Sequence, residues 1–546
     1  MIVHESRNPA FRRPFGAVKA GERVYLAAEK ENMTRAELIL RRFTGEEERL
    51  PMTREGDGRF SVTLTMPAEP CVLWYSVSDG TEETCQWQIT VYAPAPVLDW
   101  WKNAVVYQIF PDRFARERDW TPREPAERKG AHRFLLRDWA APPFYPRDEE
   151  NRVSAWPFWG GTLKGIEEKL PYLASLGVTV LYLCPIFEAC SSHRYDTGDY
   201  FRIDPLLGTE EDFVSLCRSA GERGMHVVLD GVFNHTGADS RYFDKFGNYG
   251  TGDQYRRWFR FGEGYTHGYE CWWDVPDLPD IEENEPSYRE FLCGEQGVVR
   301  HWLRKGASGW RLDVADELPD SLIREIRSAM KTEKSDSLLL GEVWEDASCK
   351  VSYGELREYF LGRELDAAMH YPFRTATLSF LRGETDAREA AEALWSIREH
   401  YPPEHQLSAL NLIGSHDRER ALTALSGDRA LLRLWLAMMF CFPGVPCIYY
   451  GDEAGMTGGA DPYNRGSFPW DKKDELTDYI RELTVLYREH DALRNGDTAY
   501  DRLSPEALVC RRWNEREEIT AVFNRGELPV EYRGETVPAK GWKMFL

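Results

Sequence analysis

The sequence predicts an α/β fold: a (β/α)8 TIM barrel with loop insertions, flanked by an N-terminal β-sandwich and a small C-terminal all-β domain. Three patterns indicate it. β-Prone runs fill the first 92 residues, eight apolar runs alternate with helical stretches after Trp101, and β runs return in roughly the last 50 residues. A length of 546 residues accommodates these parts, because α/β barrels often span about 250 residues or more.

The composition is that of a globular protein and disfavours several classes of partner. Hydrophobic residues make up 42% and charged residues 29% of the chain, which supplies a large core. A net charge of −22 repels phosphate backbones and anionic lipid, so nucleic acid and membrane surfaces are poor partners. The aromatic share of 13% suits the binding of sugar rings, although large cores alone also explain it.

Nothing in the sequence indicates a leader peptide, a membrane span or a disulfide framework. Residues 1–13 carry charges and proline without an apolar core, and no run reaches the roughly 18 apolar residues of a membrane span. The eleven cysteines are scattered and form no CxxC pair, which indicates reduced thiols and no zinc site. We therefore expect a cytoplasmic protein.

Residues 1–97 are expected to form the N-terminal sandwich, a carbohydrate-binding-like module. Turn signals such as Asp79-Gly80 separate short β-prone runs at the spacing of a sandwich. These runs are Arg23–Ala28, Ala36–Arg41, Phe60–Met66, Val72–Ser78 and Gln86–Tyr92. The stiff linker Ala93–Pro96 leads out of this domain.

Residues 98–490 are expected to form the barrel. Continuous apolar runs are typical of buried parallel strands, and eight of them separated by helical patterns fit the fold. The eight runs are Val105–Phe110, Val178–Leu183, Val227–Asp230, Gly309–Asp313, Leu338–Glu342, Asp366–Met369, Ser408–Leu412 and Pro446–Tyr450. Residues 491–546 are expected to form the C-terminal β domain, with runs at Ala507–Trp513, Glu518–Asn524 and Trp542–Leu546.

Two segments interrupt the barrel pattern. Residues 116–160 and 234–286 are rich in Gly, Pro, Tyr and Trp, and we interpret them as loop insertions at the catalytic end. The aromatic residues of the first insertion either line a cleft wall or pack the insertion onto the barrel; they are Trp139, Tyr145, Trp156, Phe158 and Trp159.

Polar and charged residues cluster where several predicted strands end. They are Asp230, Asn234, His235, Arg311, Asp313, Glu342, His416 and Asp417. Because the carboxyl ends of barrel strands meet at one face, these side chains are expected to share one mouth. A single Asp after an apolar run is usually a helix cap, but the repetition strains that explanation. A buried Arg in a strand also needs acidic partners.

Such a cluster is what the cleavage of an acetal requires. One carboxylate attacks the anomeric carbon, while a carboxylic acid protonates the leaving oxygen and later acts as base toward water. A neighbouring Arg lowers the pKa of the nucleophile, and an apolar, acidic pocket raises the pKa of the acid. The residues therefore indicate a glycoside hydrolase.

Four ordered stretches resemble motifs of the α-amylase superfamily, glycoside hydrolase family 13. They read DGVFNH (230–235), GWRLDVADE (309–317), GEVW (341–344) and LIGSHD (412–417). Supporting stretches read YQIFPDRF (107–114), HRYDTGDY (193–200) and YYGDE (449–453). The resemblance covers about residues 101–470 and implies a retaining hydrolase of α-1,4 and also α-1,6 glucosidic bonds.

The resemblance also assigns roles to matching residues. It implies that Asp313 is the nucleophile, Glu342 the general acid/base, and Asp417 the carboxylate that holds and distorts the sugar at the cleavage site. The residues expected to bind substrate, with Arg311 also orienting Asp313, are Arg311, His235, His416, Tyr195, Trp344, Glu317 and Arg465. Asp230 and Asn234 are expected to be structural.

Narrower features resemble the neopullulanase, cyclomaltodextrinase and maltogenic amylase branch. VADE (314–317) is similar to that branch's VANE, with Asp316 in place of Asn, and GEVWED (341–346) is similar to its GEIWHD. In these intracellular enzymes an N-terminal sandwich helps to form a dimer and closes the partner's site. The resemblance therefore implies a homodimer acting on maltooligosaccharides, cyclodextrins or pullulan.

No metal ion or organic cofactor is expected. The branch often binds calcium after the PDRF motif, but ARERDWTPRE (115–124) keeps only Asp119 and lacks clustered oxygen ligands. Two alternatives remain beside hydrolysis: transglycosylation on the same substrates, and a non-catalytic glycan-binding protein. The presence of Asp313, Glu342 and Asp417 argues against the second. The preferred glucan, the linkage ratio and the oligomeric state stay open.

Overall fold

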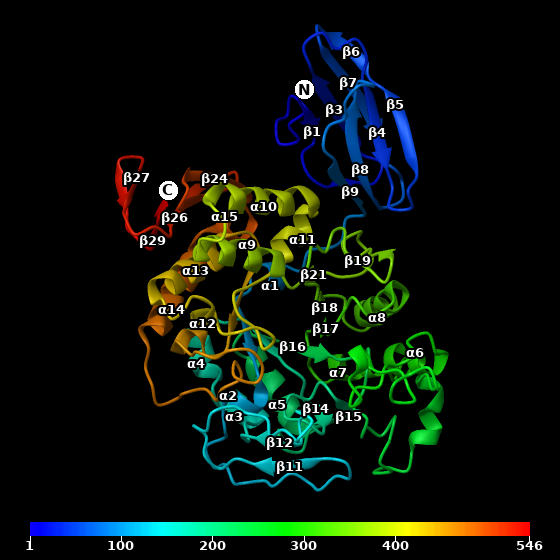
Figure 1. Cartoon of the computed structure of the whole chain (residues 1–546). Coiled ribbons are helices and arrows are strands. Elements are labelled where there is room, and N and C mark those ends of the chain that lie inside the picture. Colours follow the sequence, from blue (N-terminus) through cyan, green and yellow to red (C-terminus); the bar gives the residue numbers. More distant parts are fainter.

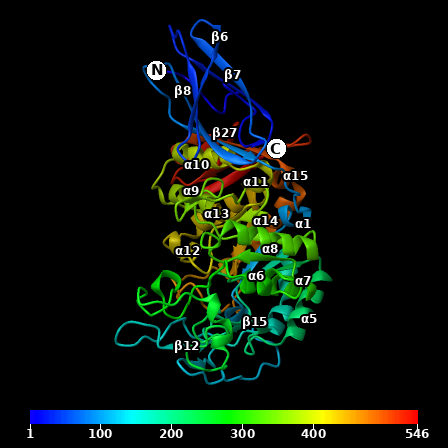
Figure 2. The ribbon, with the colours of Figure 1, turned by 90° about the vertical axis from the view of Figure 1, so that its right-hand side faces the viewer.

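The computed structural model describes all 546 residues and is built around three groups of strands (Figure 1). The N-terminal strands stand apart at one end of the molecule, an eight-stranded parallel sheet lies at its centre, and a four-stranded antiparallel sheet contains the C-terminal strands. The side view shows the same order, with the N-terminal strands rising above the rest of the chain (Figure 2). The fold class is therefore the one that the sequence predicts.

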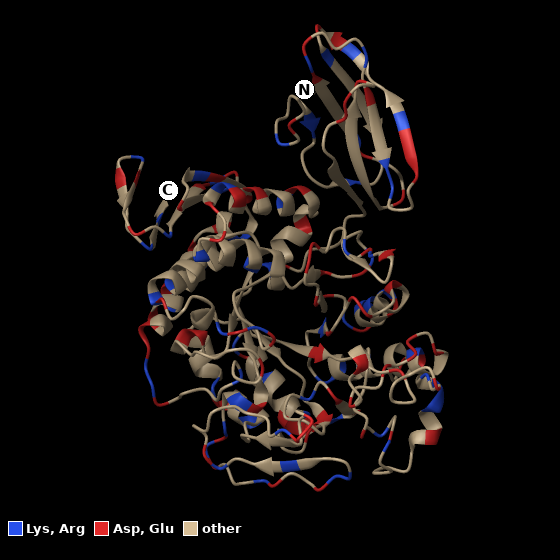
Figure 3. Ribbon diagram, in the orientation of Figure 1, with Lys and Arg blue, Asp and Glu red and all other residues tan.

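The N-terminal strands form two packed sheets. Their orders are β1-β3-β7-β6 and β2-β9-β8-β4-β5. The bounds are β1 (Arg12–Arg13), β2 (Val18–Lys19), β3 (Arg23–Glu29), β4 (Glu37–Arg41), β5 (Glu47–Pro51), β6 (Thr53–Gly56), β7 (Arg59–Thr65), β8 (Cys71–Ser78) and β9 (Trp87–Tyr92). Buried side chains such as Val24, Leu38 and Ile89 fill the space between the sheets. The sequence did not predict β5 and β6, because their mostly charged and exposed residues give no apolar signal (Figure 3).

The central sheet closes into a barrel whose strands follow one another in chain order. The bounds are β10 (Val106–Ile109), β13 (Val180–Leu183), β16 (His226–Gly231), β17 (Gly309–Leu312), β18 (Leu338–Gly341), β21 (Ala367–Ala368), β22 (Leu410–Leu412) and β23 (Val445–Tyr449). Strand β23 pairs with β10, and a parallel bridge from Met369 to Leu410 joins β21 to β22. All eight predicted barrel strands are therefore confirmed.

Helices surround the barrel strands. The longer ones are α5 (Glu210–Gly221), α8 (Asp320–Glu333), α9 (Tyr371–Arg382), α10 (Ala387–His400), α13 (Arg429–Cys441) and α14 (Glu475–Glu489). Side-chain caps start several of them: Thr209 and Asp212 form a capping box at α5, and Asp428 accepts two backbone N–H groups at α13. None of the helices has both the length and the hydrophobicity that crossing a bilayer requires.

The first insertion packs against the barrel through its aromatic rings. Its short parallel ribbon consists of β11 (His132–Leu135) and β12 (Ala155–Phe158). Phe158 and Trp159 are fully buried, and the indole N–H of Trp139 donates to the carbonyl oxygen of Phe468 at 2.9 Å. Trp156 faces a cavity, and its ring centroid lies 5.0 Å from that of His193. Packing therefore explains most of these rings.

The C-terminal sheet shares the barrel's hydrophobic core. Its strands are β24 (Asp497–Ser504), β25 (Ala507–Trp513), β26 (Glu518–Asn524) and β29 (Gly541–Phe545), and a hairpin of β27 (Val530–Tyr532) and β28 (Glu535–Val537) precedes β29. Phe523 of β26 packs on Phe442, which follows α13, with ring centroids 5.5 Å apart. The expected domain boundaries near residues 97 and 490 remain predictions.

The N-terminal sandwich is attached to α10 and to the loop that follows β18. Arg12 and Glu399 form a buried ion pair at 2.6 Å. The Gln88 amide donates to the Ser348 hydroxyl at 2.9 Å, and the Thr90 hydroxyl donates to the carbonyl oxygen of His400 at 2.7 Å. The sandwich thereby contacts the chain a few residues beyond the catalytic end of β18.

Candidate active site

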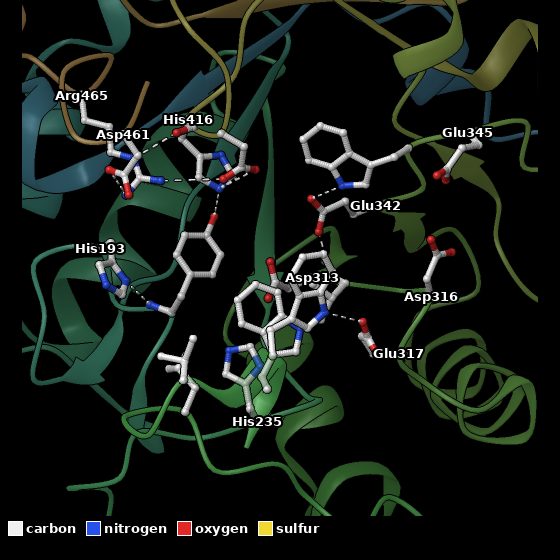
Figure 4. A pocket seen from close by; sticks show the side chains of 18 of the residues that line it. His193, His235, Asp313, Asp316, Glu317, Glu342, Glu345, His416, Asp461 and Arg465 are labelled. Carbon is white, nitrogen blue, oxygen red and sulfur yellow. Dashed lines mark hydrogen bonds and ion pairs between the residues drawn. The ribbon is translucent and has the colours of Figure 1, made fainter. Parts of the chain in front are cut away.

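A cavity of about 710 Å³ opens at the carboxyl ends of the barrel strands (Figure 4). Its walls come from loops that follow several different strands and from the second insertion. The lining residues are His193, Tyr195, His235, Trp272, Trp273, Val275, Leu278, Asp313, Val314, Asp316, Glu317, Glu342, Trp344, Glu345, Lys350, His416, Asp417, Asp461 and Arg465.

A buried arginine organises the floor of this cavity. The register of β16 and β17 places Asp230 beside Arg311, and Asp313 lies two residues further on the same face of β17's extension. Nη1 of Arg311 donates to Asp230 Oδ1 at 2.6 Å and to Asp313 Oδ1 at 2.8 Å. Asp230 also accepts hydroxyl groups of Tyr182 and Tyr195, at 2.8 and 2.9 Å. Asp230 is thus a buried counter-ion, and Arg311 lies beneath Asp313 and outside the lining.

Glu342 follows β18 and approaches the same guanidinium from the neighbouring strand. Its Oε2 lies 2.9 Å from Nη2 of Arg311 and accepts the backbone N–H of Val314 at 2.7 Å. Its Oε1 accepts the indole N–H of Trp344 at 3.1 Å. Val314 has φ 40°, an outlying conformation for a β-branched residue, and this turn directs its N–H at Glu342.

Burial and hydrogen bonds act in opposite directions on the carboxyl groups around Arg311. Burial raises the pKa of Asp313 well above its usual range and also raises the pKa of Glu342, while Arg311 opposes both shifts. Three carboxylates lie within ion-pair distance of one guanidinium, so they cannot all be ionised at low cost. Arg311 donates a hydrogen bond to Asp313, whereas Nη2 makes none to Glu342. The N–H groups of Val314 and Trp344 also donate to Glu342, so hydrogen bonds favour the ionised form of both carboxyl groups, and the role of Glu342 as the protonated acid remains a prediction from the resemblance.

His416, Asp417 and Arg465 form the opposite wall. The Gln108 amide donates to Nδ1 of His416 at 2.9 Å, which leaves the hydrogen on Nε2. This Nε2–H donates to the Tyr195 hydroxyl oxygen at 2.5 Å and lies 3.1 Å from Asp417 Oδ2. Burial and the charge of Arg465 hold the pKa of His416 well below its usual value, so its ring is neutral. Arg465 lies 3.7 Å from Asp417 Oδ1 and 2.8 Å from Asp461 Oδ1.

Two polar atoms in the wall have no hydrogen-bond partner in the protein. They are Nε2 of His235 and Nε1 of Trp272, whose rings lie 5.5 Å apart. Burial lowers the pKa of His235 to about 3, which keeps its ring neutral. The ring of Tyr195 lies parallel to that of His416, with centroids 5.1 Å apart. His235 and Trp272 both line the cavity, so these two atoms are suited to bind a polar ligand.

The structure brings the sequence-predicted residues together. Asp313, Glu342 and Asp417 line one cavity, as do the predicted binding residues other than Arg311, namely His235, His416, Tyr195, Trp344, Glu317 and Arg465. Their individual roles remain predictions. Sequence reasoning missed Trp272, Trp273, Glu345, Lys350 and Asp461 as lining residues. The aromatic pair in the second insertion was a usable signal, whereas nothing in the sequence indicated Lys350.

Arg116 supplies a cation in residues 115–124, the segment where the resemblance would place calcium ligands. Its guanidinium donates to the backbone carbonyl oxygens of Trp159, Leu136 and Arg137 at 2.9, 2.7 and 3.0 Å. Elsewhere, Cys190, Asp196 and Asp239 converge, but Asp239 pairs with Arg128 at 2.8 Å and Asp196 accepts backbone N–H groups. The donor set around Arg116 therefore does not fit calcium. That the protein binds no calcium remains a prediction.

Comparisons with known proteins give one consistent result. The family model described as alpha amylase, catalytic domain, matches residues 108–495. The amylopullulanase of Thermoanaerobacterium saccharolyticum is 32% identical over 91% of this chain and 45% of its own length, so the chain spans less than half of that relative. The cyclomaltodextrinase of Geobacillus thermopakistaniensis is 37% identical over 80% of this chain and 72% of its own.

A solved structure gives the same picture. The ligand-free cyclic α-maltosyl-(1→6)-maltose hydrolase from Arthrobacter globiformis is 32% identical, with a TM-score of 0.72. The match covers 83% of this chain and 99% of that one. This match supports the barrel fold of the chain.

Proposed function

Because the chain belongs to the α-amylase family, we propose that it is a retaining glycoside hydrolase of α-glucans. Its substrates in this proposal are maltooligosaccharides, cyclodextrins or pullulan, cleaved at α-1,4 and also at α-1,6 glucosidic bonds. One observation carries the proposal: Asp313 and Glu342 both reach one buried guanidinium at the mouth of the barrel, beside a cavity of about 710 Å³. The similar proteins include a cyclomaltodextrinase and a cyclic α-maltosyl-(1→6)-maltose hydrolase, and these names support the substrate class.

The proposed reaction has two displacements. In the first, a carboxylate oxygen of Asp313 forms a bond to the anomeric carbon, the glycosidic C–O bond breaks, and the proton of Glu342 passes to the leaving oxygen. In the second, Glu342 takes a proton from water, the water oxygen bonds to the anomeric carbon, and the ester to Asp313 breaks. Each carboxyl group returns to its starting protonation state, and the product keeps its anomeric configuration.

The opposite wall is proposed to hold the sugar that is attacked. Asp417 accepts its hydroxyl groups, and the neutral ring of His235 donates to it through its unpartnered Nε2–H. His416 borders the same sugar, with its Nε2–H directed at the Tyr195 hydroxyl. The charge of Arg465 opposes the burial that raises the pKa of Asp417, and the ring of Tyr195 provides a flat face for the pyranose. Hydrogen bonds of this kind accelerate the reaction if they strengthen in the transition state.

Several further properties belong to the same proposal. The N-terminal sandwich, which the resemblance links to dimer formation, is present in this chain, so we propose a homodimer. The contacts of Arg116 support a protein that works without calcium. The net charge of −22 supports a function away from nucleic acid and membrane surfaces, and a cytoplasmic location fits the same picture.

A direct assay tests the function. The protein is incubated with γ-cyclodextrin, maltotriose and pullulan, and reducing sugar is measured, with Asp313→Asn as the negative control. We expect release from at least one glucan, and longer products at high maltotriose would indicate transglycosylation. If no α-glucan releases sugar, the proposed function is wrong and the non-catalytic glycan-binding alternative is favoured.

A further inference from the structure

The rim of the cavity carries two unusually exposed aromatic rings. The exposed fraction is 78% for Trp273 and 77% for Tyr353, whereas the next most exposed aromatic residue, Tyr463, reaches 60%. Trp273 lies in the short 3-10 helix η2 (Trp272–Asp274) of the second insertion. Tyr353 lies in the turn between β19 (Val351–Ser352) and β20 (Glu355–Leu356). Two segments distant in the sequence thus present rings to solvent at the same rim.

One carboxylate joins these two rings. The indole N–H of Trp273 donates to Glu317 Oε1 at 3.2 Å (Figure 4). The hydroxyl of Tyr353 donates to Glu317 Oε2. Both oxygens of Glu317 are therefore engaged by side chains of the protein. The contacts indicate that Glu317 holds the rings in place and has less capacity left for direct contact with a sugar.

The backbone at both rings is strained. Trp273, Asp274 and Tyr353 have φ values of 50°, 60° and 53°, in the left-handed region that residues with a Cβ seldom adopt. Such conformations persist only where the surrounding structure imposes them, and they cluster at ligand clamps. Strain and exposure together cost stability, and the tether to Glu317 and the stacking of Trp273 on Trp272 offset part of this cost.

The ring of Trp273 is the outermost of three neighbouring rings that begin with His235 in the cavity wall. The rings of His235 and Trp272 lie 5.5 Å apart, and those of Trp272 and Trp273 also lie 5.5 Å apart at 28°. Glu317 and Glu342 lie on one side of the cavity, and Arg465 and Asp461 lie on the other (Figure 4). Because the leaving group departs on the side of its proton donor, Trp273 and Tyr353 stand on the leaving-group side.

We propose that Trp273 and Tyr353, tethered by Glu317, form a platform on which the glucosyl units of the leaving group, or of a sugar acceptor, stack. This rests on the proposed function, because it takes Glu342 as the proton donor. The ligand is a chain of α-linked glucose beyond the cleaved bond, whose apolar ring faces match exposed aromatic rings. Occupation of the platform by a sugar acceptor favours transfer over hydrolysis, since it places a hydroxyl group where water would attack.

The platform is tested by comparing a long substrate with a short one. Trp273→Ala and Tyr353→Ala are assayed on maltohexaose and on p-nitrophenyl α-maltoside, whose leaving group is a single aryl ring. We expect kcat/KM on maltohexaose to fall roughly tenfold, mainly through KM, with less than about a twofold change on the aryl maltoside. Transfer products should fall in proportion. Phe43→Ala, at a 44% exposed ring of the sandwich, is the matched control.

Two other outcomes would overturn the platform: equal losses on both substrates, or no loss on maltohexaose. Binding of maltohexaose to the wild-type protein and to the two ring variants, measured by calorimetry, separates this inference from the proposed function. A wild-type protein that binds but does not cleave refutes the function alone, and an unchanged Kd in Trp273→Ala refutes the platform alone. Absence of binding to the wild type refutes both.

The positioning role of Glu317 has a test of its own. Glu317→Gln and Tyr353→Phe are expected to raise KM for maltohexaose several-fold while kcat and Tm stay near their wild-type values. Because both changes break the same contact, the double variant should be no worse than Glu317→Gln alone. Additive effects in the double variant, or a loss confined to kcat, would contradict a tether.

Discussion

The floor and the rim of the cavity differ in residue type: the floor is charged and buried, and the rim is aromatic and exposed. The floor consists of buried charges around Arg311, each with a defined partner, whereas the rim presents Trp273 and Tyr353 to solvent with one carboxylate between them. A charged, desolvated floor suits bond breaking, because its groups are already oriented before the reaction. An exposed aromatic rim suits reversible contact with sugar chains of varied length. Changes to the floor should therefore affect chemistry, and changes to the rim should affect which chains are used.

The largest expected effect is at the floor. Asp313→Asn and Glu342→Gln should each lower kcat by about three orders of magnitude or more, since they remove the nucleophile and the proton donor. Both substitutions keep the shape of the side chain, so Tm should change little. Steady-state rates on maltotriose and a thermal melt check this, and near-normal turnover in either variant would remove that residue from the reaction.

Removal of the buried guanidinium should damage both stability and chemistry. In Arg311→Met, Asp230 and Asp313 lose their shared cation, so the free energy of unfolding should fall by about 3–5 kcal/mol. Arg311 lowers the pKa of Asp313, and its loss should move the acidic limb of the kcat/KM profile to higher pH. Urea unfolding and a pH–rate series measure the two effects. An acidic limb that stays in place would show that Arg311 does not control Asp313.

A smaller effect, on the pH dependence of the reaction, is expected from a change at Trp344, which contacts Glu342. The indole N–H of Trp344 stabilises ionised Glu342, so Trp344→Phe should raise the pKa of Glu342 further. Because the acid must be protonated to act, the alkaline limb of the profile should move to higher pH by about one unit or less. A shift to lower pH would contradict the assignment of Glu342 as the proton donor.

The smallest expected effect is that of a chelator. The carbonyl oxygens beside the first insertion are engaged by Arg116, so neither the floor nor the rim depends on calcium in this account. Dialysis against EDTA should leave activity and Tm almost unchanged. A large loss of activity or Tm that added calcium restores would show that a calcium ion stabilises the floor or the rim.

The difference between floor and rim also explains what the sequence could predict. Barrel strands such as β16 and β17 are buried on both faces, so they are visible as apolar runs, and the motif residues at their ends define the floor. Strands β5 and β6 were missed because they are short, charged and exposed. The fold class and the residues of the floor therefore follow from the sequence.

The rim could not be derived in the same way. The contact of Trp273 and Tyr353 with Glu317 joins residues 36 and 44 positions apart, and it depends on two left-handed turns at residues other than glycine. No local pattern encodes such turns. Glu317 was correctly placed at the cavity from its motif, but that motif gave no sign that both its oxygens are engaged.

The central claim, attack by Asp313 on the anomeric carbon, is tested most directly by trapping the covalent intermediate. The protein is treated with 5-fluoro-α-glucosyl fluoride, whose ester is slow to hydrolyse, and the labelled peptide is identified by mass spectrometry. We predict a single glycosyl ester on Asp313 that disappears as activity returns. A label on another residue, or an active enzyme that releases inverted product without any label, would contradict the account.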